Sequence, residues 1–304
     1  MQKRITFLTT VFFLLVVFLP DIHAAQKGRQ PDNTDSVGPR VTDVIHSMTL
    51  SLDDKDTAYR GGDVIEFKVA DVKSVPDLVF KKGFIQTVSL NGTVLGSDSY
   101  DRHRVRLPEG LLFTGTNRVS VNYIRLYSHK GSGLYRLTDL RDGKVYVYTK
   151  REVGDNATLF PVFDQKDAVA SYVLRTEVPE GWRVISSNPE ELVTFPQNGK
   201  KLWTFKTTKL APQSVSLAAG PFEMWRDRQG QATVRLFAPV SAKVGDKALA
   251  LLKRISQGIK RSDTNAKKSS SNTHDHVLLP GIENTVSDDS GVAIVDEQTL
   301  MKGK

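Results

Sequence analysis

The sequence has 304 residues, 39% of them hydrophobic and 8% aromatic, which excludes a disordered chain and suits one large or two medium domains. It contains no cysteine, so a disulfide framework and a lipid anchor on an N-terminal cysteine are both excluded. The formal net charge is +8, and much of the excess lies over 253–268 with no aromatic residue interleaved. A solvated helix end is therefore favoured there over a nucleic-acid-binding surface.

The first 25 residues have the pattern of a secretory signal peptide. Lys3 and Arg4 precede an apolar run over 5–19, and Ala24 and Ala25 supply small residues for cleavage. The run is too short to span a membrane comfortably, and no second run of that length follows. We expect a signal peptide over 1–25, a flexible lead-in over 26–41, and an exported periplasmic or extracellular chain without a stable membrane anchor after cleavage.

Short strand patterns and turn signals alternate from about Thr42 to Trp225. Asn91-Gly92 between two apolar runs is a strong signal for a two-residue hairpin. Strands are predicted over 48–52, 64–69, 85–90, 94–95, 105–108, 118–123, 145–149, 170–176, 202–206, 215–219 and 222–225. The spacing predicts a mainly β fold, a saddle-like antiparallel β-sandwich over 42–225.

The pattern becomes sparser over 226–304. A strand is predicted over 234–239 and two more over 277–280 and 291–295. A helix is predicted over 246–257 with Leu249, Leu252 and Ile255 on one face. The Ser-, Lys- and Asn-rich stretch 261–273 is typical of a linker. We expect a short, incomplete α/β segment that packs loosely.

The stretch 145–182 carries the most specific motif. Thr149, Glu152 and Asp155 precede the run Phe160-Pro161-Val162-Phe163-Asp164-Gln165, in which aromatic rings flank a fixed proline bend. This pattern resembles the N-terminal β-domain of zinc aminopeptidases of the aminopeptidase N type, and the resemblance extends over about 42–225. The sequence departs from the family pattern at Lys150, Ala157 and Lys166, where the family has Gln, Arg and Pro.

The resemblance implies that two carboxylates hold the ammonium group of a peptide's first residue. Glu152 matches the β-domain carboxylate, although it could equally be an ordinary exposed acid at a strand end. Aligning on Pro280 and Gly291 places Asp288 over the glutamate of the family's G-A-M-E-N strand. That strand is degraded here, and we interpret it as non-functional, with Asp288 as the remaining candidate.

The zinc ligands and general base that the resemblance implies are missing from these residues. No H-E-x-x-H occurs, and the family carries that motif beyond the position of Lys304. His274 and His276 would share a strand face, but two imidazoles without a third ligand make a weak metal site. We therefore predict no catalytic residue, no metal site and no cofactor in this chain, and we interpret 226–304 as a truncated, degenerate start of a metallopeptidase catalytic domain.

Three functions stay open at this stage. The favoured one is an exported, non-catalytic aminopeptidase N-like protein that binds peptides with free N-termini. The second is the N-terminal fragment of a split or frameshifted active zinc aminopeptidase. The third is a β-sandwich scaffold or binding module in the cell envelope. No nucleic-acid partner is expected.

Overall fold

A computed structural model describes residues 40–151, 159–165, 169–187, 189–196, 199–229, 232–263, 273–282, 286–287 and 291–302. The predicted signal peptide over 1–25 and most of the lead-in lie outside these ranges. Within them, no helix is both long enough and apolar enough to cross a membrane.

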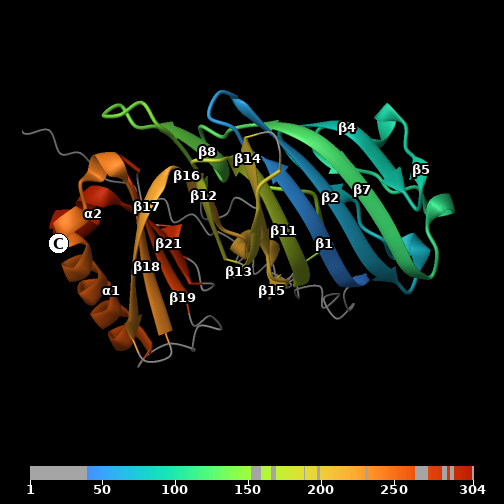
Figure 1. The fold of residues 1–304 in the computed structure, drawn as a ribbon. Helices are drawn as coiled ribbons and strands as arrows, with labels where there is room; N and C mark the ends of the chain where they lie inside the picture. The colour runs from blue at the N-terminus through green and yellow to red at the C-terminus, as the bar shows by residue number, and fades with distance from the viewer. Residues whose placement is uncertain are drawn as a thin grey trace, which may run out of the picture. The chain divides into compact units, whose positions relative to one another are not determined.

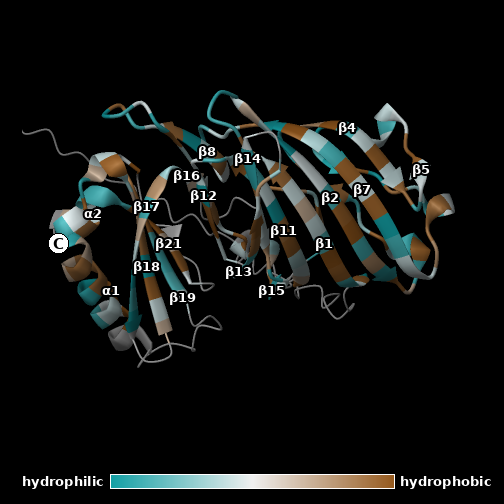
Figure 2. Cartoon of the chain, viewed as in Figure 1, coloured by the Kyte–Doolittle hydropathy of each residue, from teal (hydrophilic) through white to brown (hydrophobic). Residues whose placement is uncertain are grey.

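The largest sheet has nine strands in the order β13-β14-β11-β1-β2-β7-β4-β5, with β15 paired to β11. Its strands are β1 (Val41–Ser51), β2 (Ala58–Val69), β4 (Gly83–Leu90), β5 (Thr93–Val94), β7 (Gly115–Leu126), β11 (Ala170–Pro179), β13 (Glu190–Thr194), β14 (Lys200–Phe205) and β15 (Thr208–Leu210). The pairs are antiparallel except β1 and β11, which run parallel with Ile45 opposite Ser171. Hydrophobic and polar residues alternate along β1, β2 and β7, so one face is buried and the other meets water (Figures 1 and 2).

A four-stranded sheet, which we call the central sheet, packs against the buried face of the large sheet. It contains β8 (Gly133–Thr138), β9 (Val145–Lys150), β12 (Arg183–Ser186) and β16 (Leu217–Gly220) in the order β12-β16-β9-β8. A small sheet of β3 (Leu78–Val79), β6 (Arg104–Val105) and β10 (Val162–Phe163) contributes to the same core. Two packed sheets of this kind confirm the predicted β-sandwich.

The central sheet is buried on both of its faces. Val145 and Val147 of β9 belong to the core shared with the large sheet, whereas Tyr146 and Tyr148 belong to a second core. Phe237 and further residues of the C-terminal strands line that second core. A third layer therefore covers the tyrosine face of β9, which a two-layer sandwich would leave open to solvent.

The third layer is a five-stranded sheet in the order β17-β18-β19-β21-β20. Its strands are β17 (Phe222–Gln229), β18 (Ala232–Pro239), β19 (Thr273–Leu279), β20 (Val286–Ser287) and β21 (Val292–Asp296). The helix α1 (Ala248–Asp263) lies along its other face, and α2 (Glu297–Lys302) follows β21 (Figure 1). A third hydrophobic core joins α1 to β18, β19 and β21.

Several details of the C-terminal part differ from the sequence predictions. The chain does not pack loosely there, since Val277, Leu278 and Ile294 are fully buried. α1 continues to Asp263, into the predicted linker, and 264–272 lie outside the described residues. The strand β17 runs through Trp225, the predicted domain boundary.

The buried face of α1 also differs from the prediction. Leu252 and Ile255 are buried as expected, but Leu249 is 57% exposed. Ala248 and Leu251 take its place in the core. At about 100° per residue the helix turns Leu249 away from the arc defined by Ala248, Leu252 and Ile255.

The hairpin prediction is confirmed. Asn91 and Gly92 both have positive φ, 51° and 87°, as a turn that matches the twist of its flanking strands requires. The turn joins β4 to β5, with Leu90 opposite Thr93.

Packing in the central sheet predicts the effect of one substitution. A Cβ at Gly220 of β16 would lie 2.5 Å from Cδ1 of the buried Tyr146 ring. We expect Gly220→Ala to lower the free energy of unfolding by about 1–3 kcal/mol, because neither neighbouring core has room for the ring to move. Gly181→Ala is the control, since nothing lies within 4 Å of its Cβ position. Urea unfolding of both variants measures the difference, and equal stabilities would show that the central sheet is not tightly packed.

Candidate functional site

The strand β9 leads directly to the candidate acid Glu152. Thr149 is buried, and its hydroxyl accepts a hydrogen bond from Leu217 N (3.1 Å) and lies 3.3 Å from Leu217 O. Arg151 donates from Nη2 to Ser216 Oγ at 2.7 Å. The residues immediately before Glu152 are thus bound to β16 and to the turn that precedes it.

Leu159, the first described residue after 152–158, is held in place by two hydrogen bonds. The Leu159 carbonyl accepts hydrogen bonds from Tyr123 Oη (3.1 Å) and Tyr59 Oη (3.4 Å). Both tyrosines are buried side chains of the large sheet, and burial raises the pKa of each phenol. Neutral phenols are good donors, so this carbonyl has two firm partners in the core.

Aromatic packing holds the next residue. The Phe160 ring lies 5.3 Å from the His46 ring and 5.5 Å from the Tyr172 ring, measured between centroids. His46 stacks on Tyr172 at 4.9 Å and pairs through Nδ1 with Asp63 Oδ2 at 2.7 Å. His46 and Asp63 are both buried, so this pair is desolvated and is a rigid support for Phe160.

The end of the motif is bound through polar contacts. Gln165 exchanges two hydrogen bonds with the backbone of Val41, Val41 N to Oε1 at 3.2 Å and Nε2 to Val41 O at 3.1 Å. Asp164, half exposed, pairs with Arg104 at 2.9 Å. The residues that carried the family resemblance therefore attach this segment to β1 and β6.

The second candidate acid, Asp288, follows directly after β20. In the described sheet β20 is the terminal strand, with Val286 opposite Ile294 and Ser287 opposite Ala293 of β21. Ile294 belongs to the same hydrophobic core as Tyr146 and Tyr148 of β9. The strand that leads to Glu152 and the strand β21, to which β20 is paired, therefore share one core.

Glu152 and Asp288 themselves lie outside the described residues, as does Asp155. Their predicted role in binding an ammonium group stays a prediction. The structure gives the anchors on both sides of 152–158 and the edge position of β20.

The histidine pair of β19 does not form a metal site with the described residues around it. Asp275 is 3% exposed and is held by Arg235 through two hydrogen bonds of 2.6 Å. The strand alternation places Asp275 on the opposite face from His274 and His276. No group of three His, Cys, Asp or Glu side chains that could hold a metal ion occurs among the residues described. The described part of the chain therefore does not fit the zinc of the family.

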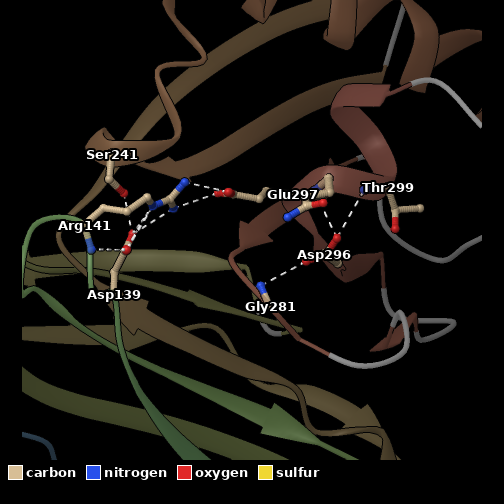
Figure 3. A network of polar contacts seen from close by, with 8 residues as sticks. Asp139, Arg141, Ser241, Gly281, Asp296, Glu297 and Thr299 are labelled. Atoms are coloured by element: carbon tan, nitrogen blue, oxygen red, sulfur yellow. Dashed lines mark hydrogen bonds and ion pairs between the residues drawn. The ribbon is translucent and has the colours of Figure 1, made fainter.

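A polar network that sequence reasoning missed ties the central sheet to the C-terminal elements (Figure 3). Asp139, in the turn between β8 and β9, is paired with Arg141 at 2.8 Å and also accepts a hydrogen bond from Ser241. Arg141 reaches across to Glu297 of α2 with hydrogen bonds of 2.6 and 2.9 Å. The Arg141 guanidinium holds the pKa of the buried Asp139 carboxyl well below its usual value.

The short helix α2 was also missed, although its start had a signal. Asp296 Oδ2 accepts hydrogen bonds from the backbone N–H groups of Gln298 (3.0 Å) and Thr299 (3.2 Å). An aspartate before a short polar run is typical of a helix N-cap. This cap orients Glu297 toward Arg141 (Figure 3).

Comparisons with known proteins find relatives for the part of the chain that forms the β-sandwich. A family described as the peptidase M1 N-terminal domain matches residues 44–215. The aminopeptidase N of Streptomyces lividans is 33% identical over 186 residues, which are 59% of this chain and 21% of that protein. The matched region of the chain thus spans about a fifth of this relative's length.

The Arg141 network predicts a stability change that depends on pH. Arg141→Gln leaves a buried carboxylate without its cation, so we expect a loss of about 1–3 kcal/mol in the free energy of unfolding at pH 7. Because the folded-state pKa of Asp139 is lowered, its contribution is complete above the ordinary carboxyl pKa and is lost as the pH falls. The difference in the free energy of unfolding between the variant and the wild type should therefore become smaller toward pH 3. Urea unfolding across this range measures it, with the exposed Arg175→Gln as control; a gap that does not change with pH would contradict the assignment.

His276 provides a second pH-dependent prediction. Burial lowers the pKa of its imidazole from 6.5 to about 4. Between pH 6.5 and pH 4, His276 is therefore protonated in the unfolded chain and neutral in the folded chain. This difference lowers the free energy of unfolding by about 3 kcal/mol as the pH falls through that range. We expect His276→Gln to reduce this decline, whereas the exposed His103→Gln should not. Denaturant unfolding at pH 7, 5.5 and 4.5 compares the three proteins; parallel curves for all of them would show that His276 is accessible to protons when folded.

Proposed function

Because the chain belongs to the peptidase M1 N-terminal domain family, we propose that residues 42–225 bind the free N-terminus of peptides through the Glu152 carboxylate. The observation that carries this proposal is the fixation of the chain on both sides of 152–158. Arg151 is bound to Ser216 on one side, and Leu159 is bound to Tyr59 and Tyr123 on the other. These contacts on both sides of 152–158 support a binding role for the carboxylate that this segment carries.

The chemistry needed is modest. An ammonium group donates charge-assisted hydrogen bonds to a carboxylate, each worth about 1.5–3 kcal/mol when water is excluded. Asp288, next to the edge strand β20, is the candidate for a second contact, and its shorter side chain reaches less far than the family's glutamate. An unpaired strand edge also offers backbone groups to an extended peptide.

We propose further that this chain binds without cleaving. The 304 residues contain no H-E-x-x-H, and the described histidines of β19 are joined by no third ligand. A catalytic zinc needs three protein ligands, and without it water is not activated near neutral pH. Binding the ground state alone does not lower the reaction barrier. The leader pattern over 1–25 supports export as the setting of this activity.

A second candidate function has its own support. The match covers 21% of the Streptomyces lividans aminopeptidase N. These residues would then be the N-terminal part of a longer or split zinc aminopeptidase, whose remaining parts supply the metal site. In that case the same Glu152 contact would position substrate for cleavage.

Binding of a labelled peptide tests the first proposal. A fluorescent tripeptide with a free N-terminus should bind at least about tenfold more tightly than its N-acetylated form, because acetylation removes the ammonium. Glu152→Gln should abolish this preference, and Glu180→Gln, at an exposed position directly after β11, should leave it intact. Fluorescence anisotropy measures the affinity of both peptides for the wild type and the two variants; equal affinity of the wild type for the two peptides would overturn the assignment.

Metal content and turnover decide between the two functions. The purified 304-residue protein should hold no stoichiometric zinc and release no chromophore from an alanine anilide. One bound zinc per chain with chelator-sensitive turnover would overturn the non-catalytic reading. Activity that appears only when a second polypeptide is added would favour the split enzyme.

A further inference from the structure

A cavity of about 270 Å³ lies between the β-sandwich and the five-stranded sheet. Arg183 of β12, Trp203 of β14, Arg226 of β17 and Arg235 of β18 line it, together with the apolar side chains of Met224 and Phe237. The volume lies just below the range of about 300–1,000 Å³ that is usual for ligand pockets. We call the three arginines, which outnumber the Glu190 carboxylate that also lines the cavity, its cationic side, and the apolar side chains its apolar side.

The cationic side carries more positive charge than the described carboxylates neutralise. Arg226 and Arg235 lie directly opposite each other in the β17–β18 pair, where two like charges are unfavourable. Arg235 is neutralised by Asp275 and by Glu190, at 2.6 and 2.9 Å. Arg226 makes no ion pair or hydrogen bond with any other described residue.

Arg183 adds a second available cation. Its Nε donates to the Phe222 carbonyl at 3.1 Å, which orients the guanidinium. Its two Nη groups have no acceptor in the described part of the chain. Arg183 and Arg226 therefore present donors to the same space, and a guanidinium binds a planar oxyanion through two parallel hydrogen bonds.

The apolar side holds an unsatisfied donor. Trp203 is 7% exposed, and its Nε1–H is buried without an acceptor among the described residues. A buried indole N–H normally finds a partner, and leaving it without one is costly. Trp203 lines the cavity, and a small shift of its ring would bring this N–H within reach of an oxygen atom of a bound molecule.

We propose that this cavity binds a small organic carboxylate. Arg183 and Arg226 hold the carboxylate group, the apolar part lies against Met224 and Phe237, and Trp203 Nε1 donates to a ligand oxygen. This site is independent of the proposed ammonium site, because its arginines would repel a peptide N-terminus. The ligand also joins β12 and β14 of the sandwich to β17 and β18, so its binding stabilises the contact between these layers.

Titration of the full chain with benzoate tests the proposal. Benzoate should bind and raise the melting temperature, whereas benzamide, its neutral analogue, should do neither at the same concentrations. Inorganic phosphate is the comparison for the apolar part, and it should bind more weakly than benzoate. Binding of benzamide equal to that of benzoate, or of phosphate tighter than benzoate, would overturn the proposal, and so would the absence of any benzoate binding.

Two variants and a matched control locate the site. Arg226→Gln should weaken benzoate binding about tenfold, because one charge-assisted contact is lost. Trp203→Phe should weaken it too while keeping the apolar wall. Arg228→Gln removes the same charge from the same face of β17, two residues away, and should change the affinity less than about twofold. Arg226 is exposed, so its variant will fold; equal affinities of the Arg226 and Arg228 variants, measured by calorimetry, would place benzoate elsewhere.

Discussion

The burial of the central sheet on both faces is the constraint on which the rest of this structure depends. Five consecutive residues of β9, Val145–Thr149, are buried, with the valines in one core and the tyrosines in another. A strand in this position needs a neighbour with small side chains, and β16 provides Ala218, Ala219 and Gly220. Because close-packed interiors transmit displacement, the large sheet, the central sheet and the five-stranded sheet cannot move independently at these contacts.

Charged groups at the edges of these layers fix how they meet. Arg141 joins the turn before β9 to α2, and Arg235 joins β18 to β13 through Glu190. Each arginine also holds a buried aspartate, Asp139 or Asp275. Such pairs contribute little net stability after desolvation, but a shifted arrangement would leave a buried carboxylate unpaired, which costs more than the intact pair contributes. These ion pairs therefore disfavour other alignments of the sheets more than they stabilise the observed alignment.

The two sites that we propose have opposite charge and depend on this layering. Glu152 follows a strand held in the middle of the molecule, where Thr149 and Arg151 are bound to the neighbouring chain segment. The arginine-lined cavity lies at another contact, where β17 and β18 meet β12 and β14. A carboxylate selects ammonium groups and an arginine pair selects carboxylates, so the two proposed ligands do not compete. Any coupling between them must pass through the central sheet.

The sequence by itself determined the mainly β class, the Asn91-Gly92 hairpin and the family, because alternation, turn chemistry and the Phe160–Gln165 motif are local signals. It also predicted α1, though not which leucines it buries. Only the tertiary structure decided that Tyr146 and Tyr148 are buried. The alternation of residues along a strand shows that it has two faces, but it does not show what packs against each face. The same holds for the contact of Arg141 with Glu297 and that of Asp275 with Arg235, which join residues 156 and 40 positions apart. It also holds for Trp203 Nε1, which has no acceptor among the described residues. Contacts between distant segments form only when the layers pack together. They therefore produce no periodic pattern in a single sequence from which they could be predicted.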